Sequence, residues 1–171
     1  MRLSDTLLKT FSEQITLELE SSIVYLQLAV ILDGQGLPGM AGWMRHQSNE
    51  ERDHAGRFIS HVTDRGGSPQ IGAIEAPTNL GDSVQDVFRA SLAHEEKVSE
   101  SIRNLYRQAQ SEGDIDSMPL LHWFIDEQIE EEATVSEILG RLALIGSDGA
   151  GLLRLDADLA GRGGGGRDGS E

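Results

Sequence analysis

Two side chains that bind metal ions well stand three residues apart in the middle of a long, regularly apolar segment. They are Glu51 and His54, within the segment 49–54. Residues three apart share one face of an α-helix, so this carboxylate and this imidazole point the same way. The apolar pattern that starts at Met44 passes through both positions and turns them toward the core. An unpaired buried charge costs roughly several kcal/mol, so a bound metal ion is one reason to bury this pair.

Three other periodic segments carry a similar polar interruption. Each apolar pattern repeats in steps of three and four residues, as expected for one face of a helix. In each segment the interruption lies near the middle. The four interruptions are Glu18, Glu51 with His54, Glu95, and Gln128 with Glu131. If the four helices have similar lengths and pack antiparallel, these side chains should meet at one depth in the core.

The elements that must position these side chains are four long helices. Ser4 is suited to cap a helix that begins at Asp5 and stops at Gly34, and Pro38 to open a second helix that runs to about Arg65. A third helix is expected from a cap at Asp82 to about residue 111. A fourth is expected from residues 117–119 to about 145, before Gly146. Apolar residues at 152–159 predict a short fifth helix.

The segment 66–81 has neither helical nor strand periodicity and is long for a link between neighbouring antiparallel helices. It suits a crossover that runs the length of a bundle. The sequence therefore predicts an all-α fold, a four-helix bundle with one long crossover and a short fifth C-terminal helix. One domain is expected over residues 1–160. The Gly-rich tail 161–171, which has six Gly and no apolar side chain, is expected to be disordered.

The composition limits the partners. The 29 acidic and 14 basic residues give a formal net charge of −15, which argues against nucleic acid or an anionic membrane as partner and favours cations. There is no Cys, so disulfides and thiolate metal sites are excluded. No apolar run approaches the ~20 residues of a membrane span, and the N-terminus lacks the apolar core of a signal peptide. A cytoplasmic location is expected.

The predicted ligand set favours iron or manganese, because hard carboxylate oxygens and one or two imidazoles suit these ions. Proteins with the ferritin-like arrangement use one Glu from each of two helices and Glu-x-x-His from the other two. Here Thr134 stands where the second His would be. His46, His94 and His122 are expected to be exposed, and His61 to be a core histidine. The run Glu130-Glu131-Glu132, with Glu50 and Glu127, is either a solvated face or a path for iron.

The sequence resembles the non-haem bacterial ferritins over about residues 3–160. The resemblance rests on Leu17-Glu18 through Ser21-Ser22 and Tyr25, on Glu50-Glu51-x-x-His54, on His94-Glu95, and on Trp123-Phe124-x-x-Glu127-Gln128-x-Glu130-Glu131-Glu132. It implies a ferroxidase that oxidises Fe(II) with dioxygen or hydrogen peroxide. It also implies a homo-oligomeric hollow cage of 24 subunits that stores the ferric mineral.

The resemblance also implies roles for individual residues. Glu18, Glu51 and His54 resemble the first iron site, with Glu51 bridging to a second site made by Glu95 and Glu131, and with Gln128 beside it. Glu50, Glu127 and Glu130 resemble ligands of a third iron site on the cavity side, which also draws on Glu131. Tyr25 either packs in the core or serves the centre as hydrogen-bond partner or electron donor.

Two positions separate the chain from the haem-binding bacterioferritins. These resemble it but carry a haem-ligating Met directly after the Glu of Glu-x-x-His, where this chain has Arg52, and they use a second Glu-x-x-His, which Thr134 rules out. No haem is therefore expected.

Two other functions remain open on the same scaffold. One is a di-metal enzyme that acts on an organic substrate or peroxide, and the other is a bundle whose polar residues only bind metal or fix the helix register.

Overall fold

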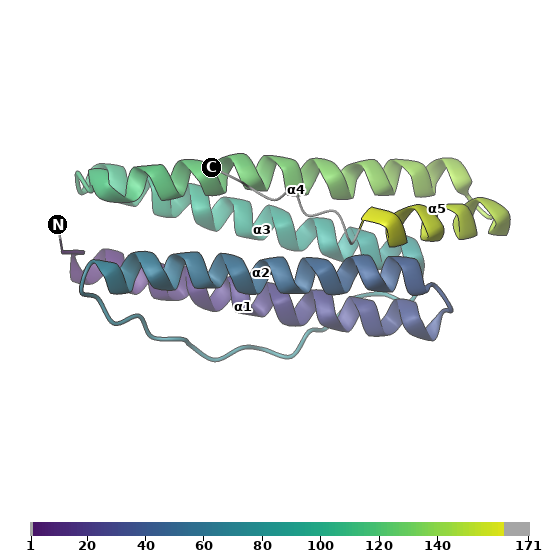
Figure 1. Cartoon of the computed structure of the whole chain (residues 1–171), viewed down its shortest axis with the longest axis horizontal. Helices are drawn as coiled ribbons and strands as arrows, with labels where there is room; N and C mark the ends of the chain where they lie inside the picture. The colour runs from purple at the N-terminus through teal and green to yellow at the C-terminus, as the bar shows by residue number, and fades with distance from the viewer. Residues whose placement is uncertain (1, 163–171) are drawn as a thin grey trace.

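Four long helices pack side by side and a short fifth helix closes one end (Figure 1). The structure is a computed structural model and describes residues 2–162. Its helices are α1 (Asp5–Gly34), α2 (Pro38–Asp64), α3 (Val84–Ser111), α4 (Met118–Ile145) and α5 (Gly149–Arg162), and a 3-10 turn, η1 (Ile115–Ser117), precedes α4. α1 pairs mainly with α2, and α3 with α4. This architecture confirms the predicted all-α bundle.

The end of the chain is described only in part. Gly161 and Arg162 belong to α5, although they are the first two residues of the tail predicted for 161–171. Residues 163–171, the rest of that predicted tail, lie outside the described residues.

Helix starts follow from local side-chain chemistry. The hydroxyl of Ser4 accepts a hydrogen bond from the Leu7 amide at 3.0 Å, which caps α1 as predicted. The prediction for α3 was wrong by one residue, because Ser83 rather than Asp82 caps this helix. The Ser83 hydroxyl accepts from the Asp86 amide at 3.1 Å. The cap and the first amide it satisfies thus both lie one residue later in the chain than predicted.

The crossover between α2 and α3 runs along the bundle as an extended chain (Figure 1). Two hydrogen bonds attach it to α1. The amide of Gln70 donates to Ser12 Oγ at 3.1 Å, and the amide of Gly72 donates to Thr16 Oγ1 at 2.9 Å. Hydroxyl groups on α1 thus replace the backbone partners that the crossover lacks, and this explains how a segment without periodicity is held in place.

The core has two apolar clusters with a polar layer between them. One cluster contains Phe11, Phe58 and Phe124, and the other contains Leu28, Met44 and Phe88. Each fully buried side chain of this size stabilises the fold by roughly 1.5–3 kcal/mol. The layer between the clusters holds the predicted polar side chains, all of them buried: Glu18, Glu51, His54, Glu95, Gln128 and Glu131.

α5 is attached to the start of α2. The carboxylate of Asp156 accepts a hydrogen bond from the Met40 amide at 2.8 Å, so a side chain from α5 satisfies one free amide of the first turn of α2. Gly39 allows this approach, because a Cβ at this position would lie 1.9 Å from the carbonyl oxygen of Asp156. Leu155 and Leu159 bury the apolar face of α5 against the bundle.

α1 is also long and apolar enough to cross a membrane by length and composition alone, contrary to the expectation from the sequence. Its buried face explains this property, because it packs Phe11, Ile15, Leu28 and Leu32 into the bundle. The same face buries the carboxylate of Glu18. The hydropathy of α1 is therefore that of a core helix.

Candidate metal centre

Three potential metal ligands from two helices meet in the polar layer. α1 contributes Glu18, and α2 contributes Glu51 and His54, which lie on one helix face as their spacing predicts. One ligand atom from each of the three lies within 4.8 Å of the others. Among residues 2–162, no other cluster of three or more His or acidic side chains comes this close.

The three ligand atoms have no partner of their own. Glu18 Oε2, Glu51 Oε2 and His54 Nδ1 are buried and make no hydrogen bond within the described part of the chain. The distance from Glu51 Oε2 to His54 Nδ1 is 3.6 Å, too long for a hydrogen bond. Buried polar atoms are almost always paired, so three such atoms close together without protein partners suit the binding of a cation.

Glu95 and Glu131 lie in the same layer but are held by other side chains. The phenol of Tyr25 donates to Glu95 Oε1, and the Gln128 amide donates to Glu95 Oε2 at 3.0 Å. The carboxylate of Glu131 accepts only long hydrogen bonds of 3.4 and 3.5 Å from Gln47 Nε2. The structure thus places the predicted second pair of acids near the first group without joining the two into one tight cluster.

The layer is strongly unfavourable for several negative charges. Burial raises the pKa of Glu18 well above its usual value, and the neighbouring Glu51 raises it further. Burial and then the charge of Glu95 likewise raise the pKa of Glu51. Burial also raises the pKa of Glu95. For Glu131, burial and the charge of Glu95 raise the pKa to about 9. Bound cations would remove this repulsion and keep the carboxylates ionised.

The three acids expected at a further iron site form a less buried group on α2 and α4. Glu50 is partly buried and accepts a hydrogen bond from Gln47 Nε2 at 2.6 Å, and it lies 3.1 Å from His46 Nδ1. Glu127 is also partly buried, whereas Glu130 is exposed. All three lie close enough to Glu131 for their charges to raise its pKa. They extend the acidic centre toward the surface.

One supporting residue, Gln14, was not predicted from the sequence. This buried side chain donates from Nε2 to Glu18 Oε1 at 2.7 Å, and its own Oε1 accepts from the Ser101 hydroxyl at 2.6 Å. It thereby fixes the orientation of Glu18 and leaves Oε2 free. A signal was present, because Gln14 precedes Glu18 by one helical turn and so lies on the same face.

The predicted exposure of the other histidines agrees with the structure only in part. The prediction that His94 is exposed was wrong, because its ring is buried between α3 and α1 and its Nε2 lies 2.7 Å from the Ser21 hydroxyl. His122 is exposed, as predicted. His61 is partly buried, with its ring centre 5.2 Å from that of Phe11 and with Nε2 2.8 Å from Ser117 Oγ.

Comparisons with known proteins agree on one family. A family model described as a ferritin-like domain matches residues 8–145. The chain is 34% identical to a probable bacterial non-heme ferritin-like protein of Haemophilus influenzae, over 92% of this chain and 95% of that protein. It is 30% identical to a bacterial non-heme ferritin of Escherichia coli, over 92% of this chain and 96% of that protein.

Solved structures are similar over the same length. An open-pore ferritin from the archaeon Archaeoglobus fulgidus superimposes with a TM-score of 0.91 at 36% identity, and the match covers 94% of this chain and 98% of that one. A closed form engineered from the ferritin of the same organism gives a TM-score of 0.90 at 37% identity, over 92% and 96% of the two chains.

Proposed function

The chain belongs to the ferritin family, and we propose on this basis that it is an iron-storage ferroxidase. It oxidises Fe(II) to Fe(III) inside the bundle and stores the product as ferric mineral in a homo-oligomeric cage. One observation in the structure supports this function above all others. It is the convergence of three buried, unpaired ligand atoms from Glu18, Glu51 and His54 at the middle of the bundle.

The substrate iron binds at two positions in this proposal. Glu18, Glu51 and His54 hold one Fe(II), and Glu95 with Glu131 holds the second, with Glu51 shared between them. Glu51 is suited to a shared role because the charges of both Glu95 and Glu131 act on it. Two Fe(II) ions then give one electron each to dioxygen, which takes up two protons and leaves as hydrogen peroxide. Carboxylate ligands favour this loss of electrons because they stabilise Fe(III) more than Fe(II).

Other side chains prepare the ligands for this step. Gln14 orients Glu18, and Tyr25 and Gln128 orient Glu95 through the hydrogen bonds described above. Groups that orient metal ligands typically alter metal affinity roughly 10–100-fold when they are replaced. Because the free carboxyl groups have raised pKa values, iron binding displaces protons into the surrounding water.

Further parts of the proposal concern transfer and assembly. Glu50, Glu127 and Glu130, with Glu131, bind a third iron on its way to the mineral. The cage contains 24 subunits, and a cytoplasmic location remains a prediction from the sequence. No haem is expected, since Arg52, in the position of a haem-ligating Met, is exposed and donates to the Asn49 side chain.

The test combines particle mass with iron oxidation. A particle of about 24 subunits should oxidise Fe(II) in air and retain far more than two iron atoms per chain. Glu51→Ala should nearly abolish the initial rate of oxidation at unchanged particle mass, whereas Asp53→Ala, an exposed acid on the same helix, should leave the rate unchanged. An unchanged rate in an assembled Glu51→Ala variant would overturn the assignment of the centre. A small oligomer that stops at two metals per chain would overturn storage.

A further inference from the structure

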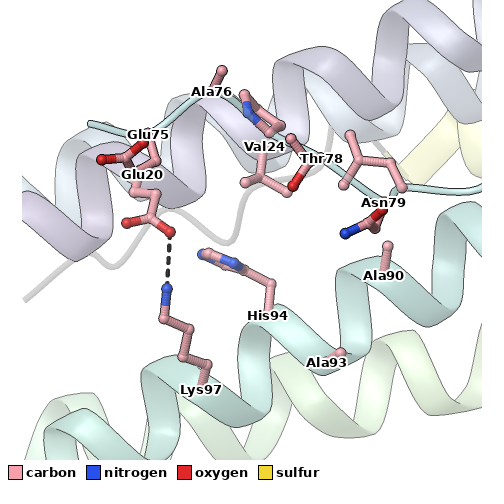
Figure 2. A pocket seen from close by; sticks show the side chains of 12 residues that line it. Glu20, Val24, Glu75, Ala76, Thr78, Asn79, Ala90, Ala93, His94 and Lys97 are labelled. Carbon is pink, nitrogen blue, oxygen red and sulfur yellow. Dashed lines mark hydrogen bonds and ion pairs between the residues drawn. The ribbon is translucent and has the colours of Figure 1, made fainter.

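A pocket of about 350 Å³ lies between α1, the crossover and α3, away from the acids on α2 and α4. Its polar lining residues are Glu20, Glu75, Thr78, Asn79, His94 and Lys97. Figure 2 shows the imidazole of His94 extending from α3 into the space between the helices, toward Glu20 and Lys97. The proposed ferroxidase reaction gives this pocket no role.

The hydrogen bonds of His94 determine which ring nitrogen is free. The Ser21 hydroxyl donates its only proton to the Leu17 carbonyl oxygen at 3.0 Å, and it lies 2.7 Å from His94 Nε2. Both contacts are satisfied only if Nε2 carries a proton and donates it to the hydroxyl. Nδ1 then keeps its lone pair, and it makes no hydrogen bond with the described residues. A neutral imidazole held in this way has the form that binds metal ions.

Two carboxylates line the same pocket. Glu20 comes from α1 and is paired with Lys97 Nζ at 2.8 Å, and Glu75 comes from the crossover and is exposed. The Lys97 side chain is 56% exposed, so it can turn into water when another cation takes its place beside Glu20. Glu20 is partly buried, but a pair with one partner in water contributes only about 0–1 kcal/mol to stability, so its loss is a small cost.

The pocket also has room for a hydrated cation. Six water molecules occupy roughly 180 Å³ at about 30 Å³ each, which is less than the volume of the pocket. One imidazole and two carboxylates match the preference of divalent ions such as Fe(II) and Co(II) for nitrogen and oxygen ligands. The excess of acidic residues, 29 against 14 basic ones, favours the approach of cations in general.

We propose that this pocket is a capture site for a hydrated divalent transition-metal ion, with His94, Glu20 and Glu75 as its ligands. These three side chains lie further apart than the ligands of the candidate metal centre, so the ion keeps part of its water shell. The pocket adjoins the candidate metal centre on its α1 and α3 side. His94 is the chain neighbour of Glu95, and Ser21, its hydrogen-bond partner, follows Glu18 by one turn of α1. The site passes Fe(II) to the centre along the α1–α3 contact. Metal binding in the pocket does not depend on the proposed ferroxidase function, whereas the transfer rests on it.

Binding is tested with Co(II) in a full-length protein that lacks the main centre through Glu51→Ala and His54→Ala. Calorimetry and visible absorption should show a Co(II) site whose affinity falls at least about tenfold in His94→Ala. Any Co(II) held by the acids that remain in the bundle, Glu95 and Glu131 among them, should be unaffected by this substitution. Lys97→Gln should strengthen binding in the pocket, since it frees Glu20. His122→Ala, which removes an exposed histidine, is the matched control. Equal Co(II) binding in the His94→Ala and control proteins would overturn the site.

Two more measurements complete the test. Glu75→Gln changes an exposed residue of the crossover and so keeps the fold, and it should weaken Co(II) binding severalfold even if His94→Ala fails to fold. Unchanged binding in Glu75→Gln would also count against the site. In the protein with an intact centre, His94→Ala should raise the KM for Fe(II) severalfold and leave kcat unchanged. An unchanged KM would refute the transfer. Because the Co(II) measurements lack the main centre, they stand even if the ferroxidase assignment fails.

Discussion

The buried carboxyl group of Glu131 should make the metal-free protein less stable as the pH rises. Burial and nearby acids raise its pKa from 4.5 to about 9 in the folded chain. Between about pH 6.5 and 8.5 the unfolded chain has lost this proton and the folded chain keeps it, so folding takes up about one proton. The stabilisation is complete below the unfolded pKa and is lost as the pH approaches the folded value.

The size of the effect follows from proton linkage. One proton per chain corresponds to roughly 1.4 kcal/mol for each pH unit. At roughly 2–4 °C per kcal/mol for a chain of this length, the Tm should fall by about 3–6 °C per pH unit. The pKa values of Glu18, Glu51 and Glu95 are raised as well, so any contribution from them has the same sign. Those of His61 and His94 are lowered, so these two rings contribute with the opposite sign, and mainly at the lower end of this window, where an unfolded histidine still binds protons.

The assay is thermal unfolding of chelator-treated protein, followed by circular dichroism at several pH values in this window. Glu131→Gln keeps the shape of the side chain and cannot ionise, so it should reduce the slope by about 1.4 kcal/mol per pH unit. It should also raise the Tm near pH 8. Asp126→Asn on the same helix, at an exposed position, controls for the loss of a surface charge. A wild-type Tm that rises with pH, or an equal slope in Glu131→Gln, would refute the reasoning.

Three further predictions concern metal loading, the second iron site and the fifth helix. In Zn(II)-loaded protein the Tm should rise with pH instead of falling, because metal binding displaces the protons of the buried carboxyl groups. A Tm that falls with pH in the loaded protein would contradict this displacement of protons. Tyr25→Phe removes the donor to Glu95 and should weaken the binding of the second metal ion roughly 10–100-fold. Co(II) titration measures this affinity, and an unchanged affinity would contradict the orienting role of Tyr25. Gly39→Ala places a Cβ 1.9 Å from the Asp156 carbonyl oxygen, whereas Gly42→Ala meets nothing within 4 Å. Limited proteolysis should therefore cut α5 faster in Gly39→Ala only, and equal rates would refute the tight contact.

Local spacing determined much of what the sequence predicts correctly. Apolar residues at steps of three and four fixed four helices and their buried faces, because neighbours on one helix face are set by the helix itself. The same rule put Glu51 and His54 side by side, and it could also have aligned Gln14 with Glu18, which was not predicted. The length of the aperiodic segment 66–81 was enough to predict a crossover. These features depend on short stretches of chain, so a single sequence contains them.

Only the tertiary structure decided how the helix faces meet. His94 was expected to be exposed because it lies off the apolar face of its helix. In the structure, α1 and the crossover cover that side of α3 and bury the His94 ring. The attachment of Asp156 to the first turn of α2 joins residues more than a hundred positions apart. No periodicity reports such contacts, because they depend on the rotation and depth of each helix against its neighbours. For the same reason the sequence alone predicted acids in a polar layer, while the three unpaired atoms of Glu18, Glu51 and His54 emerged only from the packed bundle.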